Sequence, residues 1–87
     1  MTAGERLAEA LADAEHRGDK VPCSSDPAWI SEALEDRREA ARRCTSCPVT
    51  SLCAAAAVEM GAVWGVWASV DYGDKAQRRA AMRAGAA

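Results

Sequence analysis

The chain has 87 residues and a net charge of −2, and its aromatic residues are three Trp and one Tyr. A single domain of this length buries a small core and often needs a metal site or disulfides to stabilise its fold. The mild acidity excludes strong autonomous binding of nucleic acid, although residues 1–36 carry a net −6 and residues 37–87 a net +4.

The first twenty residues contain eight charged side chains and no continuous apolar stretch, so we expect no signal peptide. No segment has the length and hydropathy of a transmembrane helix. We therefore expect a cytoplasmic protein without a membrane partner. Thiols stay reduced in that compartment, where clustered cysteines more often bind metal than form disulfides.

Apolar periodicity predicts four helices and no strand, which is an all-α fold. The first helix is expected over about residues 3–17, where Leu7 and Leu11 recur at helical spacing, and Gly18 ends it. Its apolar stripe is narrow. We therefore expect residues 1–19 to form a mobile N-terminal segment.

The second helix is predicted to follow a loop at residues 20–25. Asp26 suits an N-cap and Pro27 suits a first helical position, and the helix is expected to run to about Arg43. The arginines of residues 37–43 are expected to form a solvated face. Helical spacing places on the opposite, buried face Ile30, Leu34, Ala41 and Cys44.

The third helix is predicted over residues 48–60, with Cys47 in the N-cap place. A turn with two tryptophans follows at residues 63–67. The last helix is expected between Asp71, which can cap it, and about Arg83.

All four cysteines of the chain fall in one pattern, Cys23-x20-Cys44-x2-Cys47-x5-Cys53. A C-x2-C pair lets two thiolates from one turn bind one centre. Cys53 lies near the start of the third helix, and Cys23 arrives from a loop to close the site. The positive end of that helix lowers the pKa of a thiol at Cys47, which suits metal ligation.

Three kinds of site fit this pattern. Four thiolates can hold an iron–sulfur cluster. Structural zinc sites of four cysteines usually show two short C-x2-4-C knuckles, and this chain has one, so spacing favours the cluster over zinc. Disulfides fit a cytosolic chain poorly.

The motifs around these cysteines carry a resemblance. Cys47 is followed by Pro48-Val49, the turn holds Gly65-Val66-Trp67, and Asp26-Pro27 follows the first cysteine. Over about residues 21–83 the chain resembles the WhiB-like family of transcription regulators of high-GC Gram-positive bacteria and their phages.

The resemblance implies a small helical domain organised around a [4Fe–4S] cluster whose ligands are Cys23, Cys44, Cys47 and Cys53. It implies binding to region 4 of the primary sigma factor of RNA polymerase and a response to oxygen or nitric oxide through the cluster. By similarity Trp67 is the main sigma contact, supported by Val66, Gly65 and Trp29. We expect Trp64, which precedes the matched turn, to be a core residue.

The chain departs from the family at two places. Ala68-Ser69 stand where the family has two glycines, so we expect a turn of different shape. The family's basic tail is missing after Arg83. We therefore expect weak or partner-dependent DNA contact and a repressive role, which suits a phage-encoded member. The candidate DNA contacts are Lys75, Arg78, Arg79 and Arg83.

These observations divide the chain into the segment 1–19, a cluster-binding domain with the tryptophan turn at 20–70, and a basic helix with a short tail at 71–87. We expect a transcription regulator that is not an enzyme and has no small-molecule substrate. The alternatives are a zinc-stabilised adaptor and, without the cluster, a thiol–disulfide oxidoreductase acting through C-x2-C.

Overall fold

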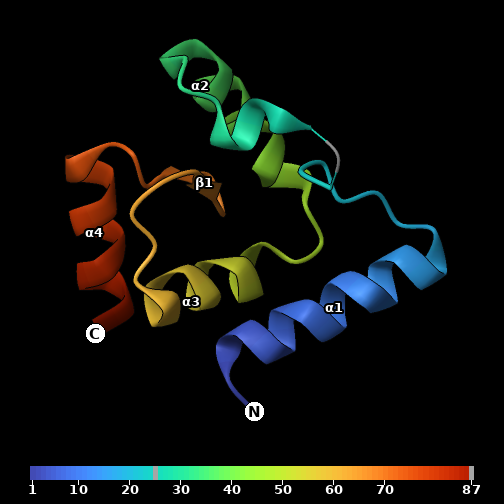
Figure 1. The fold of residues 1–87 in the computed structure, drawn as a ribbon. Coiled ribbons are helices and arrows are strands. Elements are labelled where there is room, and N and C mark those ends of the chain that lie inside the picture. The colour runs from blue at the N-terminus through green and yellow to red at the C-terminus, as the bar shows by residue number, and fades with distance from the viewer. Residues whose placement is uncertain (25, 87) are drawn as a thin grey trace.

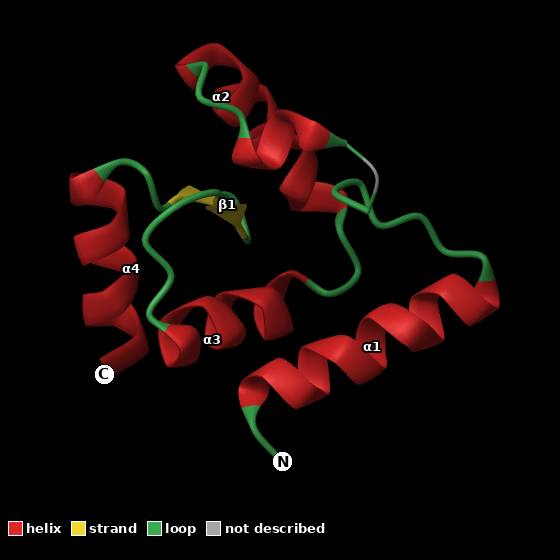
Figure 2. Cartoon of the chain, viewed as in Figure 1, coloured by secondary structure: helices red, strands yellow, loops and turns green. Residues whose placement is uncertain are grey.

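Helices make up most of the computed structural model, which describes residues 1–24 and 26–86 (Figure 1, Figure 2). Its elements are α1 (Ala3–Arg17), η1 (Pro27–Ile30), α2 (Leu34–Arg43), η2 (Cys44–Ser46), α3 (Thr50–Met60), β1 (Val66–Trp67), β2 (Val70–Asp71) and α4 (Lys75–Ala86), where η marks a 3-10 helix. The predicted all-α fold is confirmed, with a small hairpin added. Within the described residues no helix is long and apolar enough to cross a membrane.

Helix α1 has the predicted bounds because both of its ends carry strong local signals. Thr2 and Glu5 form a capping box at its start, and Gly18 closes it in the left-handed conformation with φ 78°. The helix lies beside α3 (Figure 1). The Glu59 carboxylate of α3 accepts a hydrogen bond of 2.8 Å from the backbone N–H of Ala3, which joins the two helices.

The predicted single helix from Pro27 to Arg43 is wrong, because the chain leaves the helical conformation at Ser31 (ψ 145°). The Ser31 hydroxyl accepts from the N–H of Ala33 at 3.1 Å and donates to Asp36 at 2.7 Å. These local bonds replace the helical ones.

The break also changes which residues of this region are buried. Trp29, Ala40 and Cys44 pack together with Val66, whereas Ile30 and Leu34, expected inside, are exposed. Two short helices at an angle do not share the continuous face that one helix would have. The buried cluster therefore sits where η1, the end of α2 and the hairpin meet.

Helix α3 begins at Thr50, two residues later than predicted, and Cys47 is not its N-cap. Instead Cys47 ends η2, where its N–H donates to the carbonyl of Cys44 at 3.0 Å. The Thr50 hydroxyl donates to the carbonyls of Cys44 and Cys47, both at 2.9 Å. The C-x2-C segment is thereby fixed as one tight turn against the start of α3.

Helix α4 is capped by Asp74 rather than by the predicted Asp71. The Asp74 carboxylate accepts from the N–H of Ala76 at 2.9 Å and of Gln77 at 3.3 Å. Asp71 is 3% exposed and belongs to β2. It is engaged elsewhere, so only the nearer aspartate is free to cap the helix.

Strands β1 and β2 pair antiparallel, with Val66 opposite Asp71 and Trp67 opposite Val70. The two residues between the strands are Ala68 (φ 51°) and Ser69 (φ 69°). Positive φ at both positions is the signature of a type I′ hairpin turn, which normally takes Gly or Asn. Ala68 and Ser69 both take the left-handed conformation that side chains disfavour, and the expectation of a differently shaped turn stays a prediction.

A buried ion pair holds this hairpin against α2. Arg37 Nε donates to both carboxylate oxygens of Asp71 at 3.1 Å, and Arg37 Nη1 donates to the carbonyls of Ser31 and Glu32 at 2.8 and 3.0 Å. Asp71 also accepts from the N–H of Gly73 at 2.9 Å. Arg37 is 7% exposed, so it is not part of the expected solvated arginine face.

The strained turn yields a testable expectation. A non-glycine residue in the left-handed conformation destabilises the fold by about 1–2 kcal/mol. Glycine removes this strain, but the greater entropy that it gives the unfolded chain offsets part of the gain. We expect Ala68→Gly and Ser69→Gly each to raise the free energy of unfolding by about 0.5–1 kcal/mol. Urea denaturation followed by circular dichroism measures the change in unfolding free energy, and the m-value should stay the same. Lower midpoints in both variants would contradict it.

Candidate metal centre

Three neighbouring segments carry the four cysteines. Cys44 is 6% exposed where α2 passes into η2, Cys47 is half-buried just after η2, and Cys53 is half-buried in the first turn of α3. Cys23 is exposed in the turn that precedes η1. All four are free thiols. The C-x2-C pair and Cys53 thus lie on adjoining segments, and their role as ligands stays a prediction.

The thiols lie near enough to influence one another. Burial is the largest of the causes that raise the pKa of Cys53 to about 11, and the thiols of Cys44, Cys23 and Cys47 contribute to the same rise. Burial, followed by Cys47, raises the pKa of Cys23 as well. Desolvation and mutual repulsion thus favour the protonated form of these two thiols.

In the described residues no group of three or more Cys, His, Asp or Glu side chains is arranged to hold a metal ion. Four sulfurs around one Zn²⁺ would lie about 3.8 Å apart, given Zn–S bonds of about 2.3 Å and tetrahedral geometry. In an iron–sulfur cluster each thiolate binds a separate iron. The preference for a cluster over zinc therefore rests on the spacing of the cysteines in the sequence.

Two N–H groups hydrogen-bond to these sulfurs. The indole Nε1 of Trp29 donates to Cys44 Sγ at 3.3 Å. The backbone N–H of Ala68, in the hairpin turn, bonds to the Cys53 thiol and lowers its pKa against the larger effect of burial. Sequence patterns did not reveal either contact, because each joins residues 15 positions apart. The hairpin is thus in direct contact with the cysteine site.

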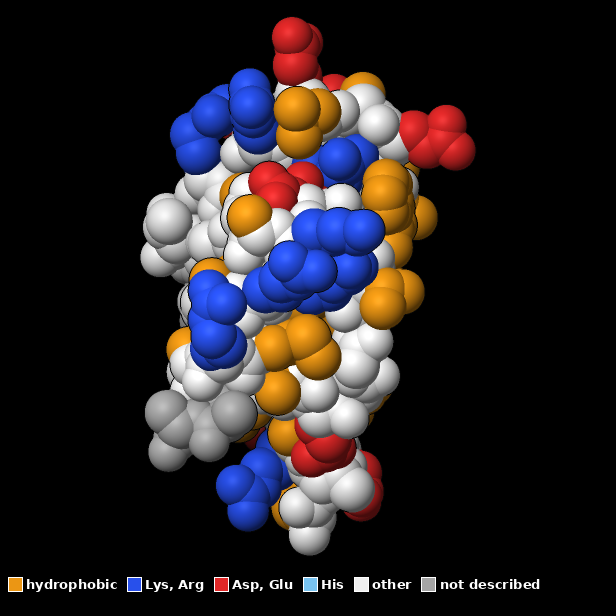
Figure 3. Space-filling view, turned by 90° about the vertical axis from the view of Figure 1, so that its left-hand side faces the viewer, with side chains coloured by type: hydrophobic (Ala, Val, Ile, Leu, Met, Phe, Trp, Pro, Cys, Tyr) orange, Lys and Arg blue, Asp and Glu red, His pale blue; other side chains and the backbone are white. Residues whose placement is uncertain are grey.

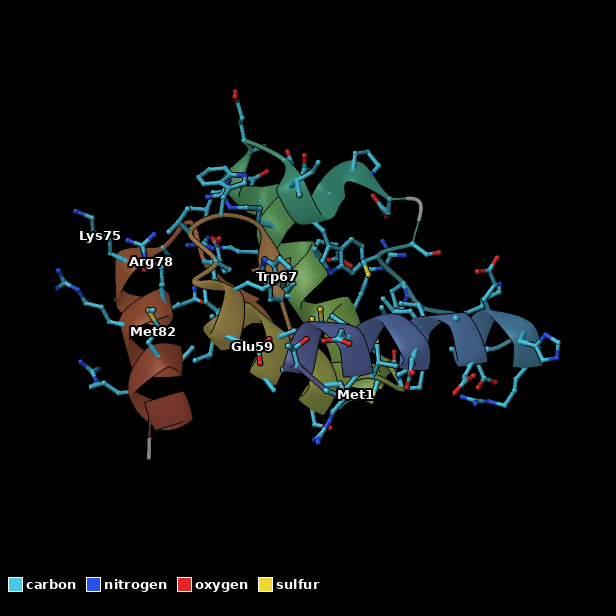
Figure 4. The ribbon with its side chains drawn as sticks, turned by 60° about the horizontal axis from the view of Figure 1, so that its bottom comes forward. Met1, Glu59, Trp67, Lys75, Arg78 and Met82 are labelled. Carbon is cyan, nitrogen blue, oxygen red and sulfur yellow. The ribbon has the colours of Figure 1, made fainter. Side chains whose placement is uncertain are left out.

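Trp67 is the only half-buried member of the predicted partner-binding set. Gly65, Val66 and Trp29 are buried. Trp67 lines a groove of about 620 Å³ between α3, α4 and the hairpin, next to Glu59 and the start of α1 (Figure 4). Alanines form much of the rest of this groove: Ala3, Ala54, Ala55, Ala81 and Ala84. Their short side chains leave an apolar hollow beside the indole.

Trp64 is 45% exposed, so the prediction of a core residue is wrong. Gly65 approaches the chain at Trp29 so closely that an added Cβ would lie 3.3 Å from the Trp29 carbonyl oxygen. The Trp64 ring lies outside this contact, with the Arg37 guanidinium 4.6 Å from its centroid. A Cβ on Gly73 would lie 2.9 Å from the ring, so Gly73 makes room for it.

The candidate DNA contacts lie on one side of α4. Lys and Arg side chains gather on the face shown in Figure 3, and Lys75 projects from α4 on the side away from Trp67 (Figure 4). Lys75, Arg79 and Arg83 are exposed. Arg78 is half-buried and donates to the carbonyls of Val63 and Tyr72 at 3.3 and 3.2 Å, so it braces the tryptophan turn.

Comparison with known proteins identifies one family. The family model described as Transcription factor WhiB matches residues 12–82 of the 87. No curated protein and no solved structure matched the chain. The matched range contains all four cysteines and the whole tryptophan turn.

The raised pKa of Cys53 predicts its reactivity in the metal-free protein. With a pKa of about 11 in place of 9.0, its thiolate fraction at pH 8 is roughly a hundredfold lower. We expect iodoacetamide to alkylate Cys53 at a rate that rises about tenfold per pH unit from pH 8 to 10. Mass spectrometry of the labelled peptide measures the rate. A profile that levels off near pH 9 would mean that the fold does not enclose this thiol.

Proposed function

The chain belongs to the WhiB family of transcription factors, and we propose that it is an iron–sulfur regulator that binds region 4 of the primary sigma factor. The proposed cofactor is a [4Fe–4S] cluster held by Cys23, Cys44, Cys47 and Cys53. The observation that carries the proposal is the approach of four free thiols from separate segments beside the tryptophan turn. A cytoplasmic location follows from a partner that belongs to RNA polymerase.

The donor set fits such a cluster. Thiolates are the usual ligands of [4Fe–4S] centres, and N–H groups that face the sulfurs are a common means of tuning them. Trp29 and Ala68 supply two such groups. A bound cluster would supply a redox-active centre that also cross-links the cysteine segments. The exposure of Cys23 leaves one edge of the site open to oxygen or nitric oxide.

The two alternatives fit less well. A zinc site of four cysteines usually has two short C-x2-4-C knuckles, and this chain has one. A thiol–disulfide oxidoreductase needs an accessible thiolate of low pKa, whereas Cys44 is 6% exposed. We therefore retain regulation of transcription, without enzymatic activity or a small-molecule substrate, as the function.

Trp67 is the proposed anchor for sigma. An aromatic side chain in an apolar hollow is a typical hot spot, and the alanine walls allow a partner helix to approach closely. Gly65, Val66 and Trp29 are buried, so we assign them the role of holding the turn rather than touching sigma. The indole N–H of Trp67 donates to the carbonyl of Trp64 at 3.0 Å, which fixes its ring.

We propose that DNA contact is weak and depends on the partner. Three exposed cations, Lys75, Arg79 and Arg83, offer few phosphate contacts on a chain with a net charge of −2. A regulator that occupies sigma without adding promoter contacts would act as a repressor. This role is compatible with a phage-encoded member of the family.

The cluster predicts a defined metal content. We expect about four irons and four sulfides per chain after anaerobic purification, with a broad visible absorption. A Cys→Ser change at any of positions 23, 44, 47 or 53 should remove the absorption and much of the helical signal, because metal binding and folding are coupled in small domains. Ser51→Ala, an exposed neighbour on α3, is the control and should retain both. Stoichiometric zinc without sulfide would contradict the proposal.

If Trp67 anchors sigma, a change at this residue should weaken sigma binding and leave the cluster in place. Trp67→Ala should lower the affinity for sigma region 4 by roughly thirtyfold or more, about 2 kcal/mol, since the buried hot spot is lost. Ala54→Arg should weaken binding similarly by filling the groove from an exposed position on α3. Both variants should keep their visible absorption. Isothermal titration calorimetry under anaerobic conditions measures the affinity.

Trp64→Ala is the matched control for the anchor, since Trp64 is exposed and does not line the groove. Its affinity for sigma should stay within about threefold of the unaltered protein. If Trp64→Ala abolishes binding and Trp67→Ala does not, the two tryptophans have the opposite roles. If neither change matters, the sigma proposal fails and an adaptor with another partner takes its place.

A further inference from the structure

The indole of Trp29 makes a contact that differs from those of the other two tryptophans. Its Nε1 donates to Cys44 Sγ at 3.3 Å in the interior, where both residues are 6% exposed. Trp64 and Trp67 instead donate to carbonyl oxygens, at 3.3 and 3.0 Å. Only Trp29 therefore directs its side-chain donor at a proposed cluster ligand.

A cation–π contact with Arg43, which is itself ion-paired, fixes the ring of Trp29. The guanidinium of Arg43 lies 4.9 Å from the ring centroid, at a distance suited to a cation–π contact. Arg43 is paired with Asp26 at 2.5 Å. Asp26 also accepts from the N–H of Ala28 at 2.9 Å and so caps η1, the helix that carries Trp29. The indole is thus held between η1 and the end of α2.

A second N–H donor to the cysteine site comes from the hairpin, which follows the cysteines in the sequence. The backbone N–H of Ala68, in the left-handed turn at Ala68 and Ser69, bonds to the Cys53 thiol. The hairpin and η1 thus each supply one N–H to a different sulfur. The backbone donor is present whatever the side chain, whereas the indole donor exists only because residue 29 is Trp.

An N–H group that faces a thiolate sulfur withdraws negative charge from it. Such bonds stabilise the more reduced, more negative state of a cluster and raise its reduction potential. They also orient the ligand, and the loss of a comparable outer partner typically costs ten- to a hundredfold in metal affinity or activity. A phenyl ring is smaller than an indole, so it can occupy the same site, but it has no such donor.

We propose that Trp29 is a positioning and tuning residue for the centre: its indole N–H orients Cys44 as a ligand and raises the reduction potential of the cluster. This inference rests on the proposed function, because it requires the cluster to be present. The aromatic ring alone provides packing, and the N–H provides the tuning. Residue 29 therefore has a role in the cysteine site that is separate from any contact with sigma.

Trp29→Phe tests the proposal, with Trp64→Phe as the matched control that removes an indole N–H bonded to a carbonyl. Both proteins are purified anaerobically with their cluster, without sigma. Iron release to an excess of chelator is followed by absorbance, the reduction potential by redox titration, and the fold by circular dichroism. We expect Trp29→Phe to release iron about tenfold faster or more and to have a more negative potential, with an unchanged helical signal.

The control separates the loss of a donor to the cysteine sulfur from the loss of an indole N–H elsewhere in the fold, and the helical signal reports any loss of packing. Trp64→Phe should match the unaltered protein in both release rate and potential. If Trp29→Phe behaves like the unaltered protein, or if both variants change equally, the inference is overturned while the cluster proposal stands. If the unaltered protein itself holds no iron and sulfide, the cluster proposal fails and this inference fails with it.

Discussion

The buried ion pair between Arg37 and Asp71 is the contact on which the arrangement of this protein depends. Alanine supplies much of the apolar composition, so few large side chains hold the hairpin against α2. Arg37 and Asp71 make that connection, and their remaining polar atoms bind backbone groups of residues 31, 32 and 73. Loss of one partner would leave an uncompensated buried charge, at about 3–5 kcal/mol, a large fraction of a small domain's stability.

The position of the hairpin links the two proposed functional features. Its turn places the N–H of Ala68 against Cys53, and its first strand places Trp67 in the groove beside α3. If the cysteines hold a cluster and Trp67 anchors a partner, as proposed, the hairpin joins the two sites through a few residues of backbone.

The scarcity of large apolar residues also shapes the partner surface. Alanines on α3 and α4 pack with little bulk, so a hollow remains between the helices beside Trp67. A partner that inserts apolar side chains there would supply area that the chain itself lacks. The strained turn at Ala68 and Ser69 lies between the two proposed functional features. Its left-handed backbone carries the N–H of Ala68 and follows directly after Trp67, the proposed anchor.

The sequence by itself determined the features that depend on neighbours in the chain: the bounds of α1, the end of α3 at Met60, the close cysteines and the turn of Trp67. The tertiary structure alone decided the burial of Arg37, the exposure of Trp64, the break at Ser31 and the cap at Asp74. Caps and spacings act within one turn of helix, so they can be read locally. Arg37 meets its counter-ion 34 residues away, and no local pattern encodes such a pairing.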